Sequence, residues 1–149
     1  MRGTIMPNLE LKVKRLTPTS LIPTLGSEYA ACYDLYADIE ADIIIWPNET
    51  KAIPTGLAFQ PPHGFMLQIL SRSGMASKGV YATGGILDED FRGEVKVLLN
   101  NNGPTEYHVH PQDRVAQLAL RRYYHADIIE TDALDATSRG DGGFGHTGR

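Results

Sequence analysis

Three consecutive carboxylates, Asp88, Glu89 and Asp90, lie near the tip of a predicted hairpin that is bounded by glycines. Carboxylates this close repel one another, so a protein tolerates them where a cation, a basic partner or water offsets the repulsion. Asp88 directly follows the apolar pair Ile86 and Leu87, and we therefore expect it at a strand end that faces a pocket. A carboxylate placed there can act as a general base.

A second candidate group follows the apolar run 65–70. Arg72, Ser73 and Gly74 come after that run and open a segment of helical composition. The first backbone N–H groups of a helical turn have no partner within the turn and attract anions. The spacing predicts an anion-binding turn, while a solvated arginine at an ordinary strand-to-turn junction explains the same pattern.

The segment 138–149 holds five of the 15 glycines. Closely spaced glycines allow backbone N–H groups to converge on an anion, and Arg139 and Thr147 add a charge and a hydroxyl. Phe144 can stack on a nucleobase, an interaction worth about 1–3 kcal/mol per base. This composition predicts a flexible C-terminal arm that closes over a phosphate, and a disordered tail is the simpler alternative.

A further carboxylate, Asp34, lies in an extended segment with Tyr36 and Asp38 on the same face. Edge-strand alternation and metal binding explain this face equally well. The single cysteine, Cys32, cannot form an intrachain disulfide, so no oxidising compartment is implied and we expect a cytoplasmic protein.

Short strands must position these groups, because apolar and polar residues alternate in brief runs separated by glycine, proline and asparagine. The pattern predicts an all-β sandwich or barrel, with buried strands at 65–70 and 94–99 and an edge or bulged strand at 51–59. Helical composition is confined to 73–78 and, more weakly, 132–136, and both segments are too short to form independent helices. We expect one domain over residues 1–149, with a core at about 8–125 and a linker and arm at about 126–149.

The charge balance narrows the classes of partner. With 14 Lys and Arg against 18 Asp and Glu, the net charge is −4, which argues against a general nucleic-acid binder. The apolar runs are too short to cross a membrane, and the first residues do not resemble a signal peptide. We therefore expect neither a nucleic-acid nor a membrane partner, and any anionic ligand must be small and bound locally.

Taken in order, these stretches resemble the homotrimeric dUTPase family, the dUTP nucleotidohydrolases, which carry five ordered motifs. Any one of the matches alone is weak, whereas five in order are specific. The resemblance spans residues 30–148, and the segments that match are 31–37, 72–74 with its flanks, 85–94, 113–118 and 139–148.

The resemblance implies a jelly-roll-like β fold, a homotrimer whose active sites are shared between subunits, and an arm that reaches over a neighbour's site. It also implies hydrolysis of dUTP to dUMP and pyrophosphate, which lowers dUTP and supplies dUMP for dTMP synthesis. Asp88 would orient and deprotonate the water that attacks the α-phosphorus, and Asp34 would hold Mg²⁺ through water. The residues expected to bind the substrate are Arg72, Ser73, Gly74, Gly85, Ile86, Leu87, Phe91, Gln117, Arg139, Phe144, Gly145, His146 and Thr147.

Three positions depart from the commonest family pattern: Phe91 replaces a tyrosine, Ala82 an asparagine and His146 a serine. Phe91 bears on sugar discrimination, Ala82 on uracil recognition and His146 on contact with phosphate. Two alternatives remain: a dCTP deaminase, or bifunctional deaminase-dUTPase, of the same fold, and a non-catalytic regulator that responds to nucleotide.

Overall fold

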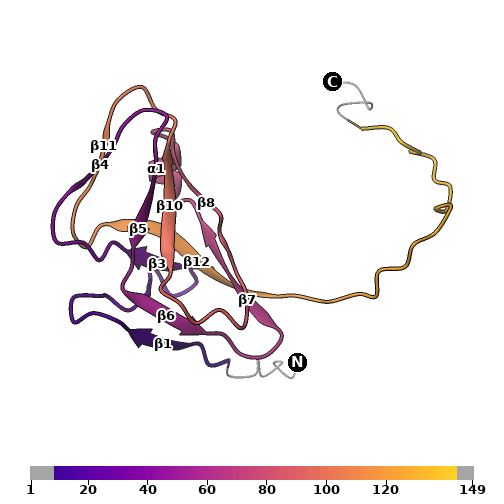
Figure 1. The fold of residues 1–149 in the computed structure, drawn as a ribbon, viewed down its shortest axis with the longest axis horizontal. Coiled ribbons are helices and arrows are strands. Elements are labelled where there is room, and N and C mark those ends of the chain that lie inside the picture. The colour runs from indigo at the N-terminus through magenta and orange to yellow at the C-terminus, as the bar shows by residue number, and fades with distance from the viewer. Residues whose placement is uncertain (1–8, 144–149) are drawn as a thin grey trace.

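The computed structural model describes residues 9–143. Within that range the chain forms twelve short strands and one helical turn, arranged in four antiparallel sheets (Figure 1). The nearly all-β architecture with one short helix confirms the expected fold class. No helix in the described part of the chain is long and apolar enough to cross a membrane.

The largest sheet has five strands in the order β2 (Thr24–Leu25), β3 (Tyr33–Tyr36), β12 (Arg114–Arg122), β7 (Phe65–Leu70) and β9 (Ile86–Leu87). Its register sets one row of residues across the three central strands. Gln117 on β12 is opposite Asp34 on one side and Leu70 on the other. The sheet therefore brings a carboxylate and an amide level with the end of β7.

Three smaller sheets complete the body. They join β5 (Thr50–Pro54), β10 (Lys96–Asn101) and β8 (Val80–Thr83); β1 (Lys12–Arg15) and β6 (Leu57–Gln60); and β11 (Tyr107–Val109) and β4 (Ile43–Ile45). The expected strand 51–59 is divided between two of these sheets. Its break falls at Gly56, whose φ of +63° disfavours side chains and redirects the chain.

The core lies between the sheets and is mainly aliphatic. Leu35, Ile53, Val97, Leu99 and Leu118 are all fully buried. On β10 buried residues alternate with less buried ones, so one face of that strand lies in the interior, whereas β3, β6 and β12 also bury adjacent residues on both faces.

A buried polar residue also links three parts of the body. The Asn101 amide donates to the carbonyl oxygens of Ile45 and Thr105, both at 2.8 Å. Asn101 is only 1% exposed, and these bonds satisfy its amide nitrogen.

The helical turn α1 spans Ser73–Ala76 and is anchored by the buried side chain of Met75. The helical propensity of 132–136 is not realised, because that segment contains no helix and is exposed along its whole length. A segment of five residues with nothing packed against it cannot repay the cost of helix nucleation. Residues 124–141 are exposed throughout and extend away from the body (Figure 1).

Candidate active site

The first part of the site is a charged cluster around Asp34. This carboxylate is buried on β3, and Nε of Arg72 lies 3.5 Å from its Oδ1. Arg72 also donates from Nη1 to the backbone oxygen of Arg114 at 3.0 Å. These contacts fix the Arg72 side chain beside the row formed by Asp34 and Gln117.

Arg114 is the residue that sequence reasoning missed. Its Nη1 lies 3.5 Å from Oδ2 of Asp34, so the buried carboxylate is shared between two guanidinium groups. A buried carboxylate is costly unless it is paired, and the second arginine supplies part of that compensation. The signal available in the sequence was the place of Arg114 in the matching segment 113–118; its pairing with the strand of Asp34 is seen only in the structure.

The turn after β7 presents the next two expected residues to solvent. Ser73 and Gly74 are exposed at the start of α1, so their hydroxyl and backbone groups are accessible. Ser71 ties this turn to the next strand, because its Oγ accepts from the backbone N–H of Ala82 at 2.9 Å. The turn predicted to bind an anion and the strand that leads into the carboxylate hairpin are therefore connected.

The hairpin predicted at residues 84–93 contains a single strand, β9 (Ile86–Leu87), which pairs with β7 and with no other strand, so the two arms of this segment do not form a ladder. The segment, still called the hairpin below, is held close to β7 at a glycine. The N–H of Ile69 donates to the carbonyl of Gly85 at 2.7 Å, and a Cβ added at Gly85 would overlap the carbonyl oxygen of Ile69. Strand β9 then pairs with β7, with Leu87 opposite Leu67, and Asp88 follows directly. Only glycine allows this approach of the two backbones.

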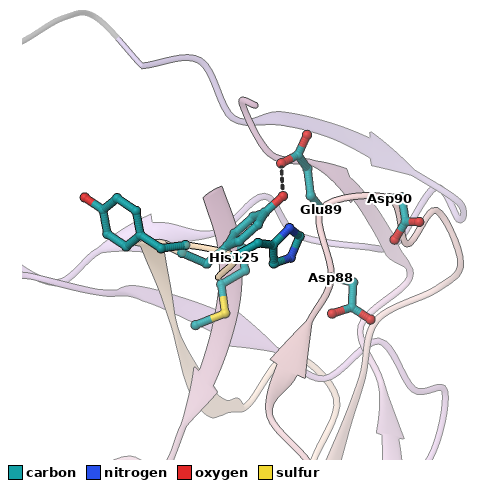
Figure 2. A pocket seen from close by; sticks show the side chains of 7 residues that line it. Asp88, Glu89, Asp90 and His125 are labelled. Carbon is teal, nitrogen blue, oxygen red and sulfur yellow. Dashed lines mark hydrogen bonds between the residues drawn. The ribbon is translucent and has the colours of Figure 1, made fainter. Parts of the chain in front are cut away.

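Asp88 lines a cleft of about 510 Å³ beside the end of β12, as expected for a strand-end carboxylate. Figure 2 shows Asp88, Glu89 and Asp90 along the turn, with His125 nearby. The other residues that line the cleft are Met66, Tyr123 and Tyr124.

The three carboxylates of the turn differ in their surroundings. Glu89 accepts hydrogen bonds from the Tyr123 hydroxyl at 2.6 Å and from the backbone N–H of Gly64 at 2.8 Å. The hydrogen bonds from Tyr123, His63 and Gly64 lower the pKa of Glu89 to about 2. The hydrogen bond between Tyr123 and Glu89 also raises the pKa of Tyr123. Asp88 and Asp90 are exposed. Glu89 is thus a poor base, whereas Asp88 is open to the cleft.

Within one chain, the cluster around Asp34 and the cleft with Asp88 are separate. Asp34 and Gln117 are level with Leu70, whereas Asp88 follows the residue opposite Leu67 and shares its cleft with Met66. The four residue steps along the strand from Met66 to Leu70 correspond to about 13 Å. The two groups therefore occupy different ends of one sheet.

The remaining expected residues vary in placement. Gln117 and Leu87 are half-buried, and Ile86 and Phe91 are exposed on the hairpin. Arg139 lies in the exposed arm and donates from Nε to the carbonyl of Gly142 at 2.8 Å, so a single chain does not bring it to either group. Phe144, Gly145, His146 and Thr147 lie outside the described residues.

The donor set around Asp34 bears on metal binding. In the described part of the chain, no group of three or more His, Cys, Asp or Glu side chains could hold a metal ion. Asp34 is a single carboxylate that already contacts two guanidiniums. These residues fit Mg²⁺ held through water and substrate phosphate oxygens, which is the arrangement Mg²⁺ prefers, and they do not fit a cage built from protein ligands alone.

The fold and the two groups define an all-β jelly-roll protein with a cation-paired carboxylate and an open acidic cleft on one sheet. The dUTPase family model matches residues 19–148. A deoxyuridine 5'-triphosphate nucleotidohydrolase from Nautilia profundicola is 44% identical over 144 residues, which cover 95% of this chain and all of the relative. The chain therefore belongs to the dUTPase family.

Solved structures agree with this fold. A mutant dUTPase of Staphylococcus bacteriophage 80alpha with dUpNHpp superposes with a TM-score of 0.85 at 21% identity, covering 94% of this chain and 99% of that one. A mutant dUTPase from phage phi11 of S. aureus, described as revealing the coordination of a structural Mg(II) ion, has a TM-score of 0.76 at 19% identity. It covers 85% of this chain and 99% of the phage chain. At these identities the likeness concerns the fold alone.

Proposed function

We propose that this chain hydrolyses dUTP to dUMP and pyrophosphate, and that Asp88 orients and deprotonates the water that attacks the α-phosphorus. The observation that carries the proposal is the exposed Asp88 carboxylate that lines the cleft, in a chain of the dUTPase family. Aspartate is a weak base, with an ordinary pKa of about 3.9, so positioning and electrostatics supply most of the acceleration.

The cluster around Asp34 is the proposed phosphate end of the site. Arg72, Ser73 and Gly74 bind phosphate oxygens, and Gln117 fixes a phosphate or a water molecule. Asp34 would hold Mg²⁺ through water, and the bound ion would supply positive charge to offset that of the triphosphate. The pairing of Asp34 with Arg72 and the exposure of the α1 turn support these assignments.

The hairpin is the proposed nucleoside end. Backbone groups at Gly85, Ile86 and Leu87 recognise uracil, and Phe91 packs against the deoxyribose. The close fit of Gly85 against Ile69 supports a rigid hairpin that can exclude a larger base. Because Ser71 already engages the backbone N–H of Ala82, we assign uracil recognition to residues beyond Ala82.

We propose a homotrimer with shared sites because the cluster around Asp34 and the cleft with Asp88 are separate within one chain, and because the arm is exposed. In the arm, Ile128 is 100% exposed and Leu134 is 88% exposed, which is unfavourable for apolar side chains that remain in water. Another copy would cover them and bring Arg139 to a site. Phe144, Gly145, His146 and Thr147 would then close over uracil and the γ-phosphate.

Pyrophosphate release in the presence of Mg²⁺ tests the proposal, with dUTP, UTP, dCTP and dTTP as substrates. We expect strong preference for dUTP, whereas ammonia release from dCTP would identify a deaminase. Asp88→Asn should suppress turnover and leave nucleotide affinity largely intact. Asp90→Asn, the matched change at the other exposed carboxylate of the cleft, should retain most of the activity. Normal turnover in Asp88→Asn would remove Asp88 from its role.

A further inference from the structure

Glu89 connects three segments that are distant in the sequence. Its Oε2 accepts from the Tyr123 hydroxyl at 2.6 Å and from the N–H of Gly64 at 2.8 Å, while Oε1 lies 2.9 Å from Nδ1 of His63. Tyr123 also donates from its backbone N–H to the carbonyl of Gly64 at 3.2 Å. The hairpin, the turn between β6 and β7 and the end of β12 therefore meet at one side chain.

This junction lies next to the residue proposed to activate water. Asp88 immediately precedes Glu89 and is itself exposed, and the turn is closed by the N–H of Phe91, which donates to the Asp88 carbonyl at 3.1 Å. The turn follows a strand of only two residues, Ile86–Leu87, so the β ladder alone gives little restraint at this point. The contacts of Glu89 supply the restraint that a longer strand would give.

We propose that Glu89 is a positioning residue for hydrolysis, which fixes the Asp88 carboxylate in the cleft by fastening its turn to Gly64, His63 and Tyr123. The inference rests on the proposed role of Asp88. A displacement of about 1 Å in a reacting group can cost about 100-fold in rate, so a restraint on the Asp88 turn bears directly on turnover.

The chemistry of the junction calls for a carboxylate. Both oxygens of Glu89 are used as acceptors, and Oε2 accepts from two donors. A glutamine has one acceptor oxygen, which can serve Tyr123 and Gly64 only if the amide nitrogen faces His63 and His63 changes from donor to acceptor. Glu89→Gln therefore keeps the size of the side chain and replaces hydrogen bonds to a charged carboxylate with weaker bonds to a neutral amide.

The test compares Glu89→Gln with the unmodified full-length chain in steady-state dUTP hydrolysis. We expect kcat to fall by about 10- to 100-fold while KM changes by less than about 3-fold, because the effect passes through the reacting group. Tyr123→Phe removes one donor and keeps the ring, so it should lower kcat less. It provides the same readout if Glu89→Gln folds poorly. Glu106→Gln, a matched change at an exposed glutamate, should leave both parameters unchanged.

A double mutant separates positioning from a general structural role. When Asp88 is already Asn, adding Glu89→Gln should change the residual kcat by less than about 2-fold, because coupled residues are non-additive. A full additional loss in that background would overturn the inference, as would unchanged kcat in both Glu89→Gln and Tyr123→Phe. If Asp88→Asn alone keeps normal turnover, the proposed function fails first, so the two failures are distinguishable.

Discussion

Gly85→Ala is a direct test of how closely the hairpin must approach β7. An added Cβ would overlap the carbonyl oxygen of Ile69 and lie 3.1 Å from its carbonyl carbon. Carbon–carbon contacts are favourable at about 3.5–4.0 Å, and the oxygen is nearer to the added Cβ than the carbon, so the hairpin must move by about 1 Å. The backbone of Ile69 cannot yield easily, because β7 is paired with β12 at this residue.

Two effects of this displacement can be measured. Overpacking costs typically about 1–3 kcal/mol, which for a chain of this size corresponds to a fall in Tm of roughly 2–12 °C. A hairpin displaced by this distance should also lower kcat/KM for dUTP by about 10- to 100-fold.

Thermal unfolding would be compared with Gly26→Ala as the stability control, since a Cβ there makes only an ordinary contact at 3.8 Å, with Oδ2 of Asp34. Pyrophosphate release would be compared with the unmodified chain, because Asp34 belongs to the proposed site. Wild-type Tm and kcat/KM in Gly85→Ala would refute the claim that the hairpin needs this contact.

Three further predictions concern other parts of the molecule. Leu99→Ala should lower the free energy of unfolding by about 2–5 kcal/mol, because Leu99 is fully buried; urea denaturation measures this. Arg114→Ala should raise KM for dUTP several-fold by loosening the Asp34 cluster, which initial-rate kinetics would detect. The hydrogen bond that His110 donates to the Asp42 carboxylate is the main cause of the raised pKa of His110, so this pair stabilises the fold fully below about pH 6.5 and loses that effect as pH rises through the raised pKa. Unfolding curves for the wild type and Asp42→Asn should therefore converge at alkaline pH; a constant gap would contradict the assignment.

The strand pattern could be predicted from the sequence because half-buried strands alternate with period 2. The runs that became β7 and β10 show this, and Gly56 explains why the predicted strand at 51–59 divides. The sequence could not show which strands pair. Asp34 is far from Gln117 and Leu70 along the chain, and their common row depends on antiparallel register between β3, β12 and β7. Registers of this kind come from packing of the whole body.

The sequence could predict which residue types to consider for the candidate site, but it could not predict which of those residues lie together. Asp88 was expected after an apolar pair, and it does follow β9 and face a cleft. The different surroundings of Asp88 and Glu89 could not be inferred, because the hydrogen bonds of Glu89 involve Tyr123, His63 and Gly64, which are distant in sequence. The second arginine at Asp34 was missed for the same reason.

Because Arg72 and Asp88 are separated within one chain, mixing two variant subunits can test whether the site is shared between chains. No movement within one chain can bring Arg72 and Asp88 together without breaking the pairing of β7, which pairs with β12 on one side and β9 on the other. In the proposed trimer, one copy supplies Asp88 and another supplies Arg72. Asp88→Asn and Arg72→Ala copies, each inactive alone, are unfolded together and refolded at a one-to-one ratio.

A shared site then carries both native residues in one arrangement only. The subunit that supplies Asp88 must be the Arg72→Ala variant, and the subunit that supplies Arg72 must be the Asp88→Asn variant. Random assembly gives that combination in about one quarter of the sites, since each choice has even odds in a closed symmetric oligomer. We therefore expect about one quarter of wild-type activity to return, with each variant refolded alone as the control. If both residues acted from the same chain, every site would lack one of them and no activity would return. The recovered fraction thus decides between a shared site and a site within one chain.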